Sequence, residues 1–141
     1  KRSVKSHEKT GRKILVSIAI VVLVLIVLGG LSLAMAFAGL KETTALEIGT
    51  VDLTQIPDGS YTGSYANSRW NTTVKVTVTD HQITTIEPVK IQSGRKDLAR
   101  ELTEDILKQQ TADVDVVSGA TASSHAYLKA VENALIEGTE G

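Results

Sequence analysis

The sequence has 141 residues, no cysteine and a formal net charge of −1 at pH 7. The lack of cysteine excludes disulfides, iron–sulfur clusters, thiolate zinc sites and lipid attachment to a cysteine. The three histidines, His7, His81 and His125, are scattered without the spacing of metal ligands, so we predict no metal site.

The near-neutral net charge is the sum of a basic N-terminal segment and an acidic remainder of the chain. Residues 1–13 contain six lysines and arginines against a single acid, Glu8. Beyond residue 40, fifteen acids outnumber nine lysines and arginines. An acidic domain without a basic stripe is unsuited to binding nucleic acid, and we expect no nucleic acid partner.

Residues 14–40 contain no charged residue and are rich in valine, isoleucine and leucine. As a helix this stretch would be about 40 Å long, enough to cross a hydrocarbon core of about 30 Å. We therefore predict a transmembrane helix at 14–40 in a lipid bilayer, preceded by a flexible basic tail at 1–13. The flanking Arg12 and Lys13 favour a cytoplasmic N-terminus, which places the rest of the chain on the outer face of the cell membrane.

A cleaved signal peptide is the alternative interpretation of the same stretch. Ala36-Phe37-Ala38 has the small-x-small pattern of a signal-peptidase site, and a basic region precedes the apolar run. The apolar run is longer than a usual signal core, so we favour a retained single-pass anchor.

A polar juxtamembrane linker is expected at 41–56, followed by a globular domain at 57–138. Pro57-Asp58-Gly59 is a turn signal at the domain boundary. After a first strand at 60–66 we expect a polar loop at 67–71. The alternation of Val74, Val76 and Val78 with polar residues then predicts a half-buried strand. After a turn at 80–82, a third strand at 83–91 contains Pro88, which favours a bend or an edge position.

Two helices are expected to cover this sheet. Residues 97–110 place Leu98, Leu102 and Ile106 on one stripe, and residues 123–137 place Tyr127, Val131 and Leu135 on another. Gly138 is a fitting stop for the second helix. The expected fold class is α+β: a small twisted antiparallel sheet packed against two helices, preceded by one transmembrane helix.

Residues 115–124 form a short extended segment, a turn of small residues and a helix start. Gly119 and Ala120 leave room for another group to approach the backbone, and Ser123 or Ser124 suits the N-cap of the following helix. A helix start favours a phosphate, and Thr121 places a hydroxyl there. Taken alone, the stretch is more readily interpreted as an ordinary turn, because glycine and serine are common turn residues.

The pattern Asp115-x-x-Ser118-Gly119-Ala120-Thr121 resembles the flavinylation motif of FMN-binding domains. These domains occur in sodium-translocating NADH:quinone reductases and in Rnf complexes. Asp58–Gly63 resembles the opening strand of the family, and residues 74–86 resemble its central hairpin. The loop at 67–71 departs from the family, because it lacks the expected glycine-rich hairpin.

The resemblance implies that Thr121 carries FMN through a phosphoester bond, installed by a magnesium-dependent flavin transferase that uses FAD as donor. It implies further cofactor-binding positions at Ser118, Gly119, Ala120, Ser123 and Ser124. Asp115 would belong to the recognition signal for the transferase, or would simply cap its own turn. Trp70, in the polar loop, is the candidate for contact with the flavin ring or with a partner.

The sequence leaves three functions open. The favoured one is a membrane-anchored electron-transfer flavoprotein that relays electrons between membrane redox partners on the outer face. The second is a non-redox accessory or scaffold subunit that binds a phosphate-bearing ligand reversibly. The third, an independent flavin-dependent reductase, is less favoured, because no acid/base cluster or second substrate domain is evident. Asn71-Thr72-Thr73 matches a glycosylation acceptor, but the motif is short and we favour a bacterial origin.

Overall fold

The computed structural model describes the backbone of residues 2–140 and the side chains of residues 9–140. The chain divides into two compact units, Lys1–Phe37 and Ala38–Gly141.

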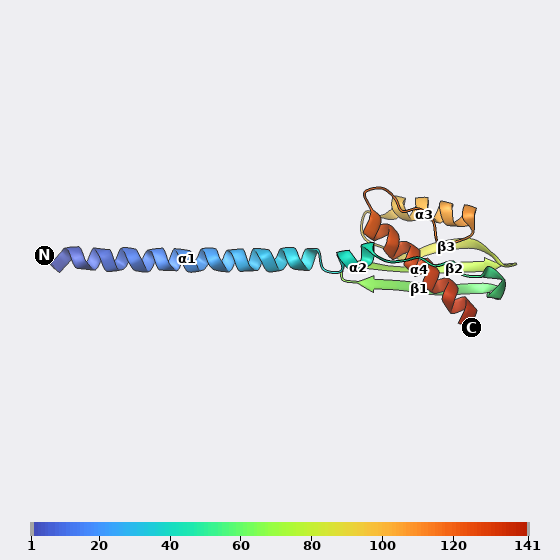
Figure 1. The fold of residues 1–141 in the computed structure, drawn as a ribbon, viewed down its shortest axis with the longest axis horizontal. Coiled ribbons are helices and arrows are strands. Elements are labelled where there is room, and N and C mark those ends of the chain that lie inside the picture. The colour runs from blue at the N-terminus through green and yellow to red at the C-terminus, as the bar shows by residue number, and fades with distance from the viewer. Residues whose placement is uncertain (1, 141) are drawn as a thin grey trace. The chain divides into compact units, whose positions relative to one another are not determined.

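The first unit is one long helix, α1 (Arg2–Ala36) (Figure 1). From Ile14 to Met35 its large apolar side chains lie exposed on all sides of the helix. An 18-residue window reaches a mean hydropathy of 3.2, so the helix is long and apolar enough to cross a membrane, a test that a signal sequence also passes. The helix includes residues 2–13, which we expected to be flexible, and it ends at Ala36 rather than at residue 40.

The second unit contains a three-stranded antiparallel sheet in the order β1-β2-β3: β1 (Gly59–Asn67), β2 (Trp70–Thr79) and β3 (Gln82–Lys90) (Figure 1). β3 lies at an edge, as Pro88 predicts. The prediction of a polar loop at 67–71 is wrong, because β1 and β2 are joined by a two-residue turn, Ser68-Arg69. Ser68 there takes a left-handed backbone, with φ of 56°.

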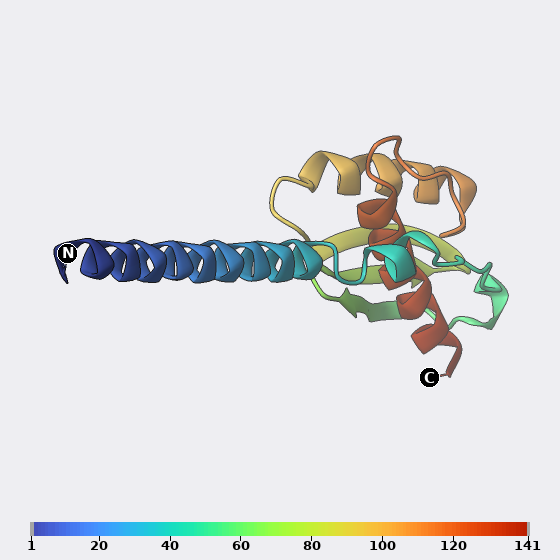
Figure 2. The same cartoon turned by 60° about the vertical axis from the view of Figure 1, so that its left-hand side comes forward.

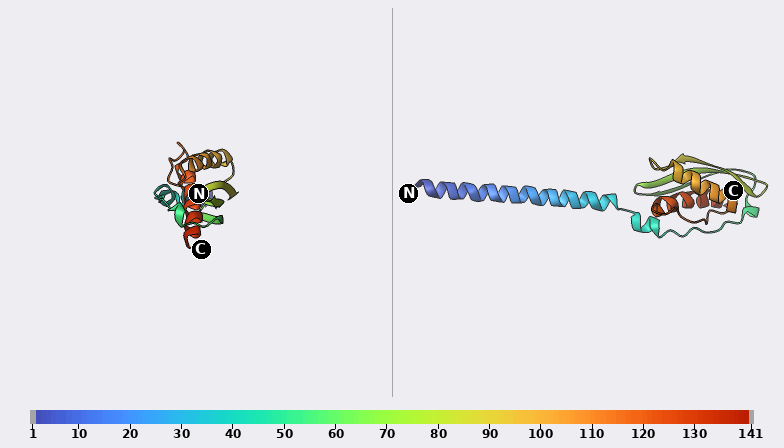
Figure 3. Two further views of the ribbon diagram at one scale, coloured as in Figure 1. Left: turned by 90° about the vertical axis from the view of Figure 1, so that its right-hand side faces the viewer. Right: turned by 90° about the horizontal axis from the view of Figure 1, so that it is seen from above.

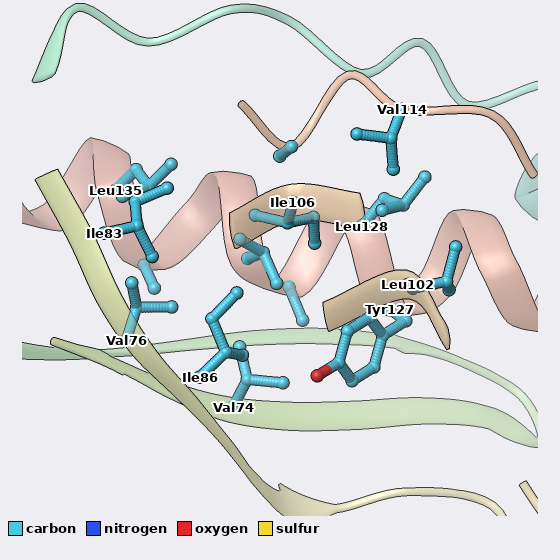
Figure 4. Packing of buried hydrophobic residues seen from close by; sticks show 14 of the residues in the cluster. Val74, Val76, Ile83, Ile86, Leu102, Ile106, Val114, Tyr127, Leu128 and Leu135 are labelled. Carbon is cyan, nitrogen blue, oxygen red and sulfur yellow. The ribbon is translucent and has the colours of Figure 1, made fainter. Parts of the chain in front are cut away.

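Both predicted helices cover one face of the sheet: α3 (Lys96–Gln109) lies near β3, and α4 (Thr121–Glu140) crosses β1 and β2 (Figures 2 and 3). Val74, Val76 and Val78 point into the layer between sheet and helices, as their alternation predicts. Figure 4 shows this core, in which Val74 and Val76 belong to the same buried cluster as Ile106 and Leu128. The α+β class is confirmed.

Glycine allows α4 to lie very close to β1. A Cβ on Gly63 would come within 2.1 Å of the Ala130 carbonyl oxygen and 2.3 Å of the Ala134 nitrogen. Gly138 does not stop α4, contrary to our expectation, since the helix continues to Glu140. A Cβ on Gly138 would lie 2.7 Å from a side-chain carbon of Ile56, so this glycine serves close packing.

The segment expected to be a linker at 41–56 instead belongs to the compact unit, which begins at Ala38. It contains the short helix α2 (Leu40–Thr44) and a 3-10 turn, η1 (Leu53–Gln55). Thr43 is fully buried, and its hydroxyl lies 2.9 Å from the Tyr65 hydroxyl. The Thr43 carbonyl lies 3.2 Å from Nδ1 of His125, which ties α2 to α4.

Replacing Gly63 by alanine is expected to destabilise the domain by about 3 kcal/mol or more, because the new methyl group would collide with rigid helix backbone. Gly59→Ala is the matched control in the same strand, since the atoms nearest to its Cβ belong to the Tyr61 side chain, the closest at 3.3 Å, and not to rigid backbone. Urea unfolding of the full chain in detergent, followed by Trp70 fluorescence, measures both variants. Equal stability of the two variants would contradict the close packing.

The Tyr127 phenol predicts a pH dependence of stability. Its hydroxyl lies 2.6 Å from the Thr103 hydroxyl, and burial raises its pKa above the ordinary 10.0, an effect that this hydrogen bond partly opposes. Because the folded state holds the proton more tightly, the stability that the phenol contributes is complete below about pH 10 and declines above it.

We therefore expect the wild type to exceed Tyr127→Phe by about 1 kcal/mol in unfolding free energy near neutrality. This difference should shrink as the pH rises above about 10. Urea unfolding at a series of pH values measures it. A difference that stays constant into the alkaline range would contradict the assignment.

Candidate functional site

The motif turn lies between an extended segment and α4. The Ala120 N–H donates to the Val117 carbonyl at 3.0 Å, which closes the turn. Gly119 has φ of +78°, a left-handed conformation that side chains disfavour, and a Cβ there would meet nothing within 4 Å. This glycine is therefore required for the path of the backbone and not for space.

Ser123 and Ser124 do not cap α4, contrary to our expectation, because the helix begins at Thr121. Both serines lie buried in its first turn. The Ser124 hydroxyl accepts the Val117 N–H at 3.1 Å, and the Ser123 hydroxyl donates to the Gln92 side-chain carbonyl at 2.8 Å. Their side chains thus hold neighbouring segments against the helix start.

Thr121 is the exposed residue of this turn of helix, while Ala122, Ser123 and Ser124 are buried. The Ser124 N–H donates a hydrogen bond to the carbonyl of Ala120, the residue before the helix, at 2.8 Å. The N–H groups before Ser124 lie in the first turn, where a helix has no acceptor of its own and carries partial positive charge. The exposed Thr121 therefore lies at an electropositive helix end.

A pocket of about 340 Å³ contains Thr121 and draws its walls from four segments of the fold. These are α2, the β1–β2 turn, the start of α3 and the start of α4, represented by Leu40, Thr44, Arg69, Trp70, Arg95 and residues 119–123. An adjoining hollow of about 420 Å³ shares Arg69, Trp70, Arg95 and Ser123 and adds Gln92 and Ser93. The lining of both hollows contains two arginines and no acid.

The sequence did not predict the arginines. Arg69 lies in the tight turn between β1 and β2, and Arg95 immediately precedes α3. They are far apart in the chain, and only the fold brings them to the Thr121 pocket. The nearest sequence signal was a glycine before Arg95, Gly94, whose φ of +76° marks the tight loop that presents this arginine.

Gln92 links the walls of the site and was also missed. Its amide nitrogen donates to the Arg69 carbonyl at 2.8 Å, and its amide oxygen accepts from Ser123 at 2.8 Å. Its backbone carbonyl accepts the Arg95 N–H at 3.2 Å. One residue thus joins the β1–β2 turn, the loop before α3 and the start of α4.

Trp70 is placed differently from our expectation. It begins β2 and is only 3 % exposed, packed with Ala122 and Ala126 of α4. The Arg69 guanidinium lies over its ring, 4.6 Å from the centroid. Trp70 therefore supports Arg69 and the helix start, and little of its surface is open to a ligand.

The remaining motif residues lie on the surface beside the turn. Asp115, Ser118 and Gly119 are exposed, and Ala120 is partly buried against the core. This surface is open to another protein along the whole motif. Among the residues whose side chains are described, no group of three or more histidines, aspartates or glutamates is arranged to hold a metal ion.

Replacing Gln92 by leucine is expected to cost about 1–2 kcal/mol of stability, since the Ser123 hydroxyl and the Arg69 carbonyl both lose their partner. Gln109→Leu, on the exposed end of α3, is the control and should change stability by less than about 0.5 kcal/mol. Thermal unfolding monitored through Trp70 measures both. An equal effect of the two substitutions would show that the hydrogen bonds of the Gln92 side chain do not stabilise the domain.

Comparison with known proteins identifies the domain. A family model described as the FMN-binding domain matches residues 69–136, a range that begins at Arg69 and contains Gln92, Arg95 and Thr121. No curated protein matches the chain significantly. Residues 69–136, in the globular part of the chain, thus match the FMN-binding domain family, and this match supports a flavin-binding protein.

Proposed function

We propose that this protein is a membrane-anchored electron carrier that holds FMN covalently, through a phosphoester on Thr121. The observation that carries the proposal is the position of Thr121, an exposed residue at the start of α4 in a pocket that Arg69 and Arg95 also line. A side chain turned into the core could not be modified. The family match supports FMN as the ligand, and the motif supports the linkage.

The residues of the site fit a phosphate group. A phosphate dianion or diester needs donors and positive charge, and the pocket offers two guanidinium groups, a helix start and no carboxylate. Gly119 has no side chain and Ala120 only a methyl group, so neither residue fills the space beside Thr121. An acidic residue in the lining would have counted against the fit.

Attachment requires a partner, because the site contains no base or metal cluster that could activate Thr121. We propose a magnesium-dependent flavin transferase with FAD as donor. The Thr121 oxygen forms the new bond to the flavin phosphate, the pyrophosphate bond of FAD breaks, AMP leaves, and the hydroxyl proton passes to the transferase. The exposed Asp115 and Ser118 lie on the surface that such an enzyme would contact.

A covalent bond suits a carrier outside the cytoplasm, where free FMN is dilute. A micromolar dissociation constant corresponds to only about 8 kcal/mol, so a reversible site would empty there. When bound, the flavin ring supplies chemistry that accepts two electrons and releases them one at a time. The chain itself supplies attachment, orientation and position, which is the work of a carrier or redox subunit more than of an independent enzyme.

The anchor and its orientation complete the proposal. The uncharged part of α1, from Ile14 to Ala36, is about 35 Å long at the rise of a helix, which exceeds the hydrocarbon core of about 30 Å. The basic residues before it favour a cytoplasmic N-terminus. The domain then faces the outside of the cell membrane, where it exchanges electrons with membrane redox partners.

A second function, reversible binding of a phosphate-bearing ligand by an accessory subunit, is favoured by the two arginines, which do not require a covalent bond. The two functions differ on denaturation. A phosphoester survives unfolding, whereas a reversibly bound ligand is lost.

Co-expression with a flavin transferase is expected to raise the mass of the peptide containing Thr121 by the mass of FMN less one water. Thr121→Val should abolish this increase, because valine has the same shape and no hydroxyl. Thr121→Ser should retain it at least in part. Thr85→Val, at an exposed threonine of β3, is the control and should be modified like the wild type.

Mass spectrometry of the denatured, digested protein measures all four chains. An unmodified wild-type peptide under these conditions would contradict the covalent function. Flavin that copurifies with the folded protein but is lost on unfolding would support the reversible function instead.

A further inference from the structure

Arg69 and Arg95 are cations without an acidic partner. In the part of the chain whose side chains are described, the two ion pairs are Asp97 with Arg100 and Glu132 with Lys129. Neither Arg69 nor Arg95 takes part in one, although acids outnumber basic residues in this domain. Both arginines line the Thr121 pocket and the adjoining hollow, which contain no acid.

Both arginines are also held at their backbones by the same residue. Gln92 donates from its side chain to the Arg69 carbonyl at 2.8 Å and accepts the Arg95 N–H at 3.2 Å. The Arg69 side chain is further fixed over the Trp70 ring, 4.6 Å from its centroid. Such restraint lowers the conformational entropy that a guanidinium loses when it binds a ligand.

We propose that Arg69 and Arg95 form a phosphate site that binds the phosphate of a flavin nucleotide non-covalently, before any bond to Thr121 exists. The inference rests on the proposed function, because the flavin nucleotide is the ligand of the same pocket. Guanidinium groups donate pairs of charge-assisted hydrogen bonds to phosphate oxygens. Two that converge on one pocket, without a competing carboxylate, place a phosphate beside the hydroxyl that is to be esterified.

The site selects flavins by their phosphate. Riboflavin has the same ring and ribityl chain as FMN but offers the arginines no anion. The arginines therefore act as positioning residues: they bind the nucleotide and orient its phosphate toward Thr121, while the transferase catalyses formation of the bond. Their contribution should weaken as salt screens the charges, since both side chains are exposed.

The test uses the full chain in detergent, produced without a transferase, with FMN and riboflavin as probes in equilibrium dialysis. The wild type is expected to bind FMN about tenfold or more tightly than riboflavin. Arg69→Gln and Arg95→Gln should each remove most of this preference by weakening FMN alone. Arg100→Gln, an exposed arginine outside both hollows, is the control and should leave the preference unchanged. Inorganic phosphate should compete with FMN and not with riboflavin.

Equal binding of FMN and riboflavin, or no binding of either, would overturn the proposal, as would an unchanged preference in Arg95→Gln. If Arg69→Gln disturbs the packing on Trp70, the Arg95→Gln variant provides the test. The Arg95 side chain is exposed and makes no ion pair within the described part of the chain, so its replacement should leave the fold intact. The measurement does not require esterification of Thr121. A positive result with an unmodified Thr121 peptide after co-expression would refute the covalent function and leave the phosphate site standing.

Discussion

The close contact of α4 with β1 at Gly63 determines how the site is built. With no side chain at Gly63, the helix lies directly on the strand, and its buried face includes Tyr127, Leu128 and Leu135. The same orientation turns Thr121 outward while its three successors point inward. The exposure of one hydroxyl is thus a consequence of packing along the whole helix and not of the turn alone.

Much of the fold could be predicted from local sequence patterns. The alternation of Val74, Val76 and Val78 predicts a strand with one buried face. The spacing of Leu98, Leu102 and Ile106 predicts a helix with one buried face, which packs on the sheet. Both patterns depend on neighbours within a few residues. The position of Thr121 beside a helix start could be predicted for the same reason, because Gly119 and Ala120 are adjacent to it.

Several of the errors concern residues whose role depends on distant partners. Gly138 resembles a helix stop, yet the helix continues because Ile56 packs against it. Ser123 and Ser124 resemble caps, yet they bond to Gln92 and Val117. The segment after α1 looks like a linker, because nothing local shows that Thr43 will be buried between β1 and α4.

The charges of the site were hidden for the same reason. The acidic total of the domain argued only against a nucleic acid partner and gave no sign of two clustered cations. Arg69 and Arg95 come together only when the β1–β2 turn and the loop before α3 meet at α4. Gln92 makes that meeting specific, since one side chain and its own carbonyl contact all three segments. The net charge of the domain does not show where individual charges lie. The fold brings two arginines together beside Thr121, where a phosphate would be attached.

The central claim is a covalent bond between the Thr121 oxygen and phosphorus. The most direct measurement is proton–phosphorus correlation NMR on the unfolded, dialysed protein made with its transferase. We expect one phosphodiester resonance, coupled both to the Thr121 β-proton and to the ribityl methylene protons of the flavin. A dialysed chain without phosphorus, or a phosphodiester coupled to a different residue, would contradict it.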